Sequence, residues 1–199
     1  VPPREEYTRT YSSSDAGLSA LMENFAKDHP GTYGVSMIEL DGKKRRAEYN
    51  GDKQFVTAST YKLLVAYSLL KRIDSGVRSW DSDQACFNKM ISLSDNACAE
   101  SFLNAIGVST LTSEANAIGL KNSTFMKGGG PYTTANDQAL LLGMIATGQN
   151  FSSANQQRLL EAMKKNIYRK GIPAGVSGTV ADKVGFMNGL LHDSAIVYG

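Results

Sequence analysis

A serine and a lysine stand three positions apart at Ser59 and Lys62, at the start of an apolar stretch. At this spacing both side chains lie on one face of a helix, where a neutral amine can accept the proton of the hydroxyl group. A serine in the first turn also has unpaired backbone N–H groups beside it, and these stabilise a developing oxyanion. The pair is therefore a candidate nucleophile and base, and an ordinary helix N-cap serine is the alternative interpretation.

The same spacing occurs again at Ser68 and Lys71, so the motif taken alone is weak. This second copy lies in the third turn of the same predicted helix, where the backbone N–H groups are already hydrogen-bonded. We therefore expect Ser68 and Lys71 to be structural residues.

Two further motifs follow in chain order, the run Ser94-Asp95-Asn96 and the pair Lys183 and Gly185. The run precedes a predicted helix, so either its serine or its aspartate can be the N-cap. The pair lies in a predicted strand, where a glycine lets the backbone approach a ligand closely.

Two cysteines and two histidines are too few for a zinc-type ligand cluster, and we expect neither a metal nor another cofactor. Cys86 and Cys98 are 12 positions apart around a predicted helix-turn-helix, and they form either a disulfide or two separate buried thiols. A disulfide would indicate an exported protein, because such bonds persist in oxidising compartments.

The composition is that of a soluble globular chain, with 42% hydrophobic and 20% charged residues among 199. The formal net charge of +2 is spread along the chain, which argues against a nucleic-acid binder. The densest basic run, at 43–46, follows the turn pair Asp41-Gly42, and we interpret it as a solvated hairpin strand. No stretch approaches the ~18 apolar residues that a membrane span needs.

The spacing of apolar residues predicts a first helix that is capped by Ser14 or Asp15, followed by a hairpin at about 33–49. Helices follow at 59–73, 84–91, 95–106, 110–117, 134–146 and 153–164, with a loop at 127–131 and strands at 178–186 and 194–197. This order predicts an α+β fold in which N- and C-terminal segments build one antiparallel sheet and a mainly helical lobe is inserted between them. We expect a single domain over 1–199, with a sheet lobe of about 1–57 and 172–199 and a helical lobe of about 58–171.

The chain resembles the serine β-lactamase and penicillin-binding protein superfamily. The motifs that carry the resemblance occur in the same order, as S-x-x-K at Ser59, S-D-N at Ser94 and K-x-G at Lys183. The resemblance extends over nearly the whole chain and is closest to class A-like β-lactamases, with further matches at 132–137 and 192–198. It implies a secreted or cell-envelope serine hydrolase, monomeric in solution, that takes a small-molecule β-lactam or a D-alanyl peptide.

The resemblance implies that Ser59 is the acylated nucleophile and that Lys62 is its base, with Lys62 Nζ within hydrogen-bond reach of Ser59 Oγ. Ser94 then relays a proton toward the leaving nitrogen. Lys183 converges on the same cleft, where it attracts the substrate carboxylate and helps to keep Lys62 neutral by like-charge proximity.

The remaining roles that the resemblance implies concern substrate binding. Asn96 hydrogen-bonds the side-chain amide of the substrate. The backbone N–H groups of Ser59 and Phe186 form the oxyanion hole, and Gly185 allows the close approach of the strand. Phe186 lies on an edge strand beside the bound acyl group.

Val184 departs from the family pattern, which has threonine or serine between the lysine and the glycine. Because valine cannot donate a hydrogen bond to the substrate carboxylate, recognition should weaken by about 1.5–3 kcal/mol.

The deacylating glutamate of class A enzymes has no counterpart in the expected loop. The run at 100–104 has the family's Glu-x-x-Leu-Asn spelling, but it begins four residues after Asn96 on the same predicted helix, so we interpret Glu100 as a decoy. Residues 120–134 contain no Glu or Asp. We therefore expect slow deacylation.

The resemblance also predicts a further strand and a long C-terminal helix after Gly199, so we expect the natural chain to continue. The first residues do not read as a signal peptide, which a mature exported protein would also lack.

The leading interpretation is a class A-like β-lactamase-related serine hydrolase that is acylated at Ser59. One alternative is a D,D-peptidase or transpeptidase that acts on peptidoglycan, and another is a non-catalytic relative that binds cell-wall peptides. The presence of Ser59, Lys62, Ser94 and Asn96 favours an enzyme, whereas Val184 favours a binding module.

Overall fold

The computed structural model describes residues 13–126 and 130–199. An N-terminal part contains β1 (Ser13–Ser14), α1 (Ala16–Asp28), β2 (Val35–Ile38), β3 (Arg45–Tyr49) and β4 (Phe55–Val56). A mainly helical part follows, with the 3₁₀ turn Ala58–Tyr61, α2 (Lys62–Asp74), α3 (Trp80–Ser92), α4 (Asn96–Ile106) and α5 (Val108–Ala117). The chain continues through β5 (Thr124–Met126), β6 (Gly130–Thr133), α6 (Ala135–Thr147), α7 (Ser153–Lys164), α8 (Ile172–Gly175), β7 (Thr179–Met187) and β8 (Leu190–Tyr198).

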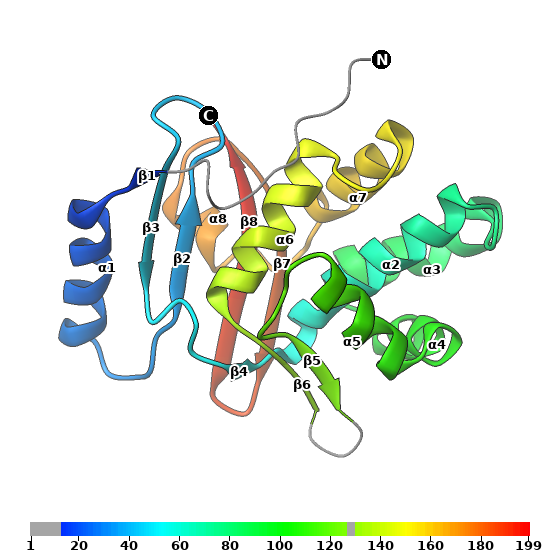
Figure 1. Ribbon diagram of the computed structural model, residues 1–199, viewed down its shortest axis with the longest axis horizontal. Coiled ribbons are helices and arrows are strands. Elements are labelled where there is room, and N and C mark those ends of the chain that lie inside the picture. Colours follow the sequence, from blue (N-terminus) through cyan, green and yellow to red (C-terminus); the bar gives the residue numbers. More distant parts are fainter. Residues whose placement is uncertain (1–12, 127–129) are drawn as a thin grey trace.

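The strands of the described residues form three hydrogen-bonded sheets, and the α+β class expected from the sequence is confirmed (Figure 1). In the first sheet β3 lies between β1 and β2, and α1 packs against it. In the second, β6 pairs with both β4 and β5. In the third, β7 and β8 form a long antiparallel ladder, with Lys183 opposite Ser194 and Gly185 opposite His192.

The expectation of one continuous sheet is wrong for the described residues, because β2 and β8 do not pair. Helix α6 packs against both strands, and a cavity of about 280 Å³ separates them. The N- and C-terminal strands are thus held together by a shared helix rather than by a backbone ladder.

Helix α2 is the centre of the hydrophobic core. Its residues are buried from Lys62 to Leu70, because apolar side chains occupy nearly every side of the helix. Helices α3, α4, α5 and α7 pack around it, and the 3₁₀ turn before it packs against β7 and β8. The start of this buried helix therefore meets the C-terminal strands.

The strands β5 and β6 were not predicted from the sequence. The predicted loop at 127–131 contains Gly130 and Pro131, which belong to β6, while 127–129 lie outside the described residues. Pro131 has no N–H group to donate, but its carbonyl oxygen accepts a hydrogen bond from Thr57 N at 2.9 Å. A proline at this strand position therefore does not interrupt the pairing that leads to the 3₁₀ turn.

Other element boundaries differ more modestly from the expectations. Helix α3 begins at Trp80 rather than at 84, and β8 begins at Leu190 rather than at 194.

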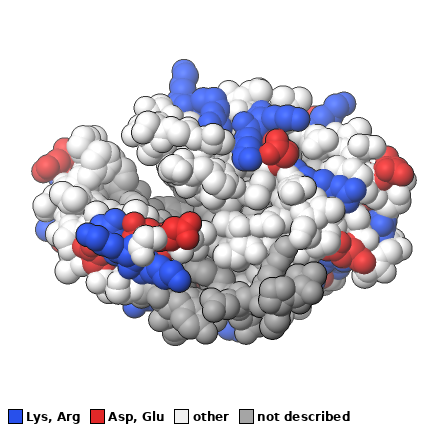
Figure 2. All heavy atoms as spheres, turned by 90° about the horizontal axis from the view of Figure 1, so that it is seen from above, with Lys and Arg blue, Asp and Glu red and all other residues white. Residues whose placement is uncertain are grey.

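Charged side chains of both signs lie in several separate places on the face shown in Figure 2. Within the described ranges, no helix combines the length and the apolar character needed to cross a membrane.

Candidate active site

Ser59 lies in the 3₁₀ turn between β4 and α2, not inside the first turn of the α-helix as predicted. The preceding residue, Ala58, has a left-handed backbone with φ of 44°. Such a conformation is strained for a residue with a Cβ atom, and strain of this kind is concentrated at functional sites. Among the described residues, Ser59 Oγ has no hydrogen-bond partner.

Lys62, the first residue of α2, is fully buried and directs its ammonium group at the turn before α4. Its Nζ donates to Ser94 O at 2.6 Å, Ser94 Oγ at 3.2 Å and Asn96 Oδ1 at 2.7 Å. An ammonium group has three donors, and these contacts use all of them. The expected Lys62–Ser59 hydrogen bond is therefore absent from the described contacts, because Ser94 and Asn96 occupy all three donors of the lysine.

Ser94 occupies the turn between α3 and α4 with a left-handed φ of 59°. Asp95 is the N-cap of α4, since its carboxylate accepts from Cys98 N at 2.8 Å. The Ser94 hydroxyl is therefore not needed as a helix cap. A disulfide joins Cys86 of α3 to Cys98 of α4 with their Cα atoms 5.2 Å apart, so this turn lies inside a covalently closed loop.

Lys183 reaches the same serine from the opposite side. It lies fully buried in β7, and its Nζ donates to Ser94 Oγ at 3.0 Å and to Val184 O at 2.8 Å. The Ser94 oxygen thus accepts from both Lys62 and Lys183. Its own proton then remains available for a third partner.

The pKa values of both lysines are lowered. Burial lowers the pKa of Lys62 to about 8, while the charges of Asp95 and Glu100 act in the opposite direction. Burial also lowers the pKa of Lys183 to about 7, and the positive charge of Lys62 contributes to this shift. Near neutral pH a fraction of these amines is therefore neutral, as a general base requires.

Gly185 brings β7 into direct contact with the 3₁₀ turn. A Cβ atom at this position would lie 2.8 Å from both Ser59 N and Thr57 O, and 3.0 Å from Thr60 N. The backbone approach therefore requires glycine. Phe186 follows at once along β7, and its side chain is 54% exposed.

No carboxylate of the segment 120–134 is available to the site, because the segment has none. The first acid after it, Asp137, accepts from Asn122 N at 2.9 Å and Ser123 Oγ at 2.8 Å and so anchors the start of β5 to α6. Glu100 lies on α4 together with Asn96, as its spacing predicted. Its side chain is exposed, and its charge acts on Lys62.

The second S-x-x-K copy lies in the middle of α2, where Ser68 is buried and donates to Glu114. Arg72 donates to the Ser68 oxygen at 2.6 Å and pairs with Glu114 at 2.9 Å. These contacts fix α2 to α5 and leave the serine without access to a ligand.

Sequence reasoning missed a buried polar network behind Lys183. Asp182 is fully buried beside it and is bonded to Asn166 and Arg169. A charged residue inside an apolar strand pattern was the signal that could have revealed it.

The cavity between β2 and β8 is a separate feature. Its lining includes Ser36, Gln138, Leu142 and His192. None of Ser59, Lys62, Ser94 or Lys183 lines it, so the lysine cluster and the cavity are different places.

The fold, together with a serine close in sequence to a buried lysine and a second buried lysine that shares Ser94 with it, can be compared with known proteins. The beta-lactamase enzyme family matches residues 17–85 and 82–199, and the chain belongs to this family. No curated protein matches the sequence.

Three solved structures illustrate the similarity of fold. An ancestral class A beta-lactamase (GNCA) is 25% identical, with a TM-score of 0.83 over 92% of this chain and 85% of that chain. The beta-lactamase of Sphaerobacter thermophilus is 18% identical, with a TM-score of 0.82 over 92% and 84%. A point mutant of PBP-A, solved as an acyl-enzyme complex with penicillin G, is 21% identical, with a TM-score of 0.85 over 98% and 84%. The chain therefore has the fold of beta-lactamase-like serine hydrolases.

Proposed function

We propose that this chain is a class A-like β-lactamase-related serine hydrolase that is acylated by β-lactams at Ser59 and deacylates slowly. The observation that carries the proposal is the Ser94 hydroxyl held between two buried lysines, one of which, Lys62, follows Ser59 by three residues at the end of the 3₁₀ turn. This arrangement offers a base, a proton relay and backbone N–H groups around one candidate nucleophile.

Acylation begins when Lys62 loses its proton. A neutral amine has two N–H donors for the three acceptors that it now contacts, so one contact is released and a lone pair becomes available to Ser59. Ser59 Oγ then forms a bond to the lactam carbonyl carbon while its proton passes to Lys62. The C–N bond breaks, and Ser94 passes a proton to the leaving nitrogen. Ser94 is reprotonated by Lys62, which balances the step.

Substrate binding uses the residues around this centre. Asn96 takes the side-chain amide of the ligand, and Lys183 attracts its carboxylate. The N–H groups of Ser59 and Phe186 hold the developing oxyanion. The close approach of Gly185 to the 3₁₀ turn supports this role, because it brings β7 near Ser59 N.

Deacylation needs a base that activates water beside the ester, and residues 120–134 supply no carboxylate. Loss of a positioned general base typically slows a step by ~10²–10⁴-fold. The acyl-enzyme should therefore accumulate.

The disulfide between Cys86 and Cys98 supports a location outside the cytoplasm, where oxidising conditions maintain such bonds.

Rapid mixing with a chromogenic cephalosporin tests the proposal. We expect a burst near one equivalent of product per protein, followed by a slow steady phase, and Ser59→Ala should abolish the burst. Fast turnover without a burst would contradict slow deacylation. If Glu100→Gln then removed that turnover, Glu100 would be identified as the missing base.

A D,D-peptidase acting on peptidoglycan is the second candidate, because such an enzyme also works without the loop glutamate. Release of D-alanine from a D-alanyl-D-alanine peptide, lost in Ser59→Ala, would favour it over the β-lactamase assignment. A protein that binds β-lactams without any covalent adduct would instead be a non-catalytic relative.

A further inference from the structure

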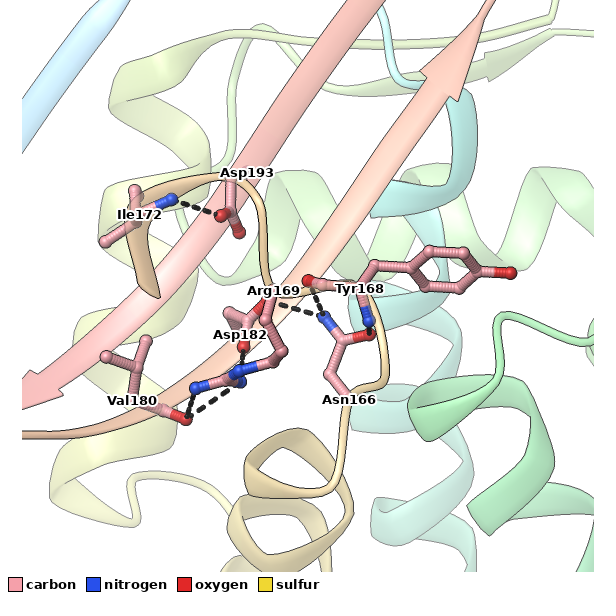
Figure 3. A network of polar contacts seen from close by, with 7 residues as sticks. All are labelled: Asn166, Tyr168, Arg169, Ile172, Val180, Asp182 and Asp193. Carbon is pink, nitrogen blue, oxygen red and sulfur yellow. Dashed lines mark hydrogen bonds and ion pairs between the residues drawn. The ribbon is translucent and has the colours of Figure 1, made fainter. Parts of the chain in front are cut away.

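The segment between α7 and α8 runs along β7 and is fixed there by buried polar groups (Figure 3). Asn166 is buried, and its side-chain amide group donates to Asp182. Its Oδ1 accepts from Tyr168 N at 3.1 Å, and its Nδ2 donates to Tyr168 O at 3.5 Å. The backbone of Tyr168 is therefore held on both its N–H and its carbonyl side by one buried asparagine.

Contacts on either side of Tyr168 complete the attachment. Arg169 pairs with Asp182 and donates to Val180 O at 3.3 and 3.4 Å. Further along, Ile172 N donates to Asp193 Oδ2 at 2.8 Å. The segment is thus bound to both strands of the β7–β8 ladder, and Tyr168 has a defined position.

The Tyr168 ring points away from this polar network, as Figure 3 shows, and meets the side chain of Phe186. The two ring centroids are 5.2 Å apart with an interplanar angle of 66°, an edge-to-face arrangement. Phe186 is nevertheless 54% exposed, and Tyr168 is half-buried. The pair therefore presents apolar aromatic surface while each ring restrains the other.

The position of the pair ties it to the candidate active site. Phe186 directly follows Gly185, where a Cβ atom would lie only 2.8 Å from Ser59 N. Two residues before Phe186 lies Val184, which is buried and has no hydrogen-bond donor in its side chain. Lys183 already donates to Ser94 Oγ and Val184 O. Beside the exposed ring of Phe186, Val184 therefore offers no side-chain hydrogen-bond donor, and Lys183 already uses its ammonium group for these two contacts.

We propose that Tyr168 and Phe186 form a specificity subsite for an aromatic substituent carried on the bicyclic ring system of a β-lactam. This inference rests on the proposed function, since it assumes that the ligand sits at Ser59. Asn166, Arg169 and Asp182 are positioning residues that hold Tyr168 against Phe186. An edge-to-face pair with one open side can accept a third ring in offset contact.

The test measures equilibrium binding in the Ser59→Ala background, where no covalent step can occur. The probes are two cephalosporins with the same acylamino group, one with a methyl and one with a styryl substituent on the dihydrothiazine ring. By calorimetry we expect the styryl compound to bind about tenfold more tightly, and we expect Tyr168→Ala or Phe186→Ala to reduce this ratio to about twofold. Tyr168→Phe, which keeps the ring, should preserve the ratio.

A second pair of cephalosporins, differing in the acylamino group alone, controls for general loosening of the site. The ratio of its affinities should be unchanged by Tyr168→Ala. Equal affinity for the methyl and styryl compounds, or no measurable binding of either, would overturn the subsite even if the unmodified protein is acylated. Conversely, a retained styryl preference without acylation of the unmodified protein would support the subsite and contradict the proposed function.

Discussion

At the residue scale, the candidate site is organised around the Ser94 hydroxyl. It accepts hydrogen bonds from Lys62 and Lys183, and its backbone has a left-handed φ of 59° that a residue with a Cβ atom rarely adopts. Asp95 supplies the helix cap instead. These contacts leave the Ser94 proton to be directed at a ligand, which is the role that we propose for it.

The protonation of Lys62 gives the first prediction. In the proposed mechanism neutral Lys62 is the base, and burial lowers its pKa to about 8, so the acylation rate should rise with pH and reach half of its maximum near pH 8. Glu100 favours the charged form of Lys62, so Glu100→Gln should move the midpoint to lower pH. Acylation rates between pH 6 and 10 measure this, with Glu23→Gln on α1 as the control. A midpoint that moves to higher pH would contradict the electrostatic argument.

The sequence predicted the type and the grouping of these residues but not their pairing. Local spacing places Ser59 and Lys62 on one side of a turn, whereas the hydrogen bonds of Lys62 Nζ depend on where α4 packs. The aromatic pair of Tyr168 and Phe186 escaped detection because its two members are joined by tertiary structure alone.

At the element scale, two junctions position the site: the contact of β7 with the 3₁₀ turn, and the turn between α3 and α4. The hydrophobic periodicity predicted α2, α4 and α7 closely, because helices with buried faces carry a strong sequence pattern. The strands β5 and β6 were missed because glycine and proline are typical of loops. Their pairing with β4 depends on contacts between segments that are far apart in sequence.

The contact of β7 with the 3₁₀ turn gives the second prediction. In Gly185→Ala the new Cβ atom would meet backbone atoms of Thr57 and Ser59, which cannot move aside as a side chain can. We expect a loss of about 1–3 kcal/mol in the free energy of unfolding and a strong loss of acylation. Urea unfolding and burst kinetics measure the two effects. Gly175→Ala is the matched control, since nothing lies within 4 Å of its Cβ position; equal behaviour of both variants would refute the close approach.

The disulfide gives the third prediction. It closes the loop from Cys86 to Cys98, which contains Ser94. Replacing both cysteines by alanine should lower the free energy of unfolding by about 2–4 kcal/mol. Acylation should also slow, because the left-handed turn at Ser94 is then less constrained. Unfolding by urea and burst amplitudes under folded conditions check both expectations, and a double variant with unchanged acylation would show that packing alone fixes the turn.

At the scale of the whole molecule, the candidate site lies where three distant parts of the chain meet. Ser59 comes from the turn before α2, Ser94 from the helical part and Lys183 from the C-terminal ladder. No local pattern determines how these parts approach one another. The assembled site could therefore be predicted only from the resemblance of the sequence to a family. The separation of β2 from β8 was not foreseen, because strand pairing was inferred from strand order alone.

Intact-protein mass spectrometry tests the central claim most directly, namely that Ser59 carries a long-lived acyl group. After brief exposure to penicillin G and removal of free ligand, the account predicts one adduct with the full mass of the ligand. Digestion should place it on the peptide that contains Ser59, the adduct should persist long after the ligand has gone, and Ser59→Ala should carry none. An unmodified mass, or an adduct on a residue other than Ser59, would contradict the account.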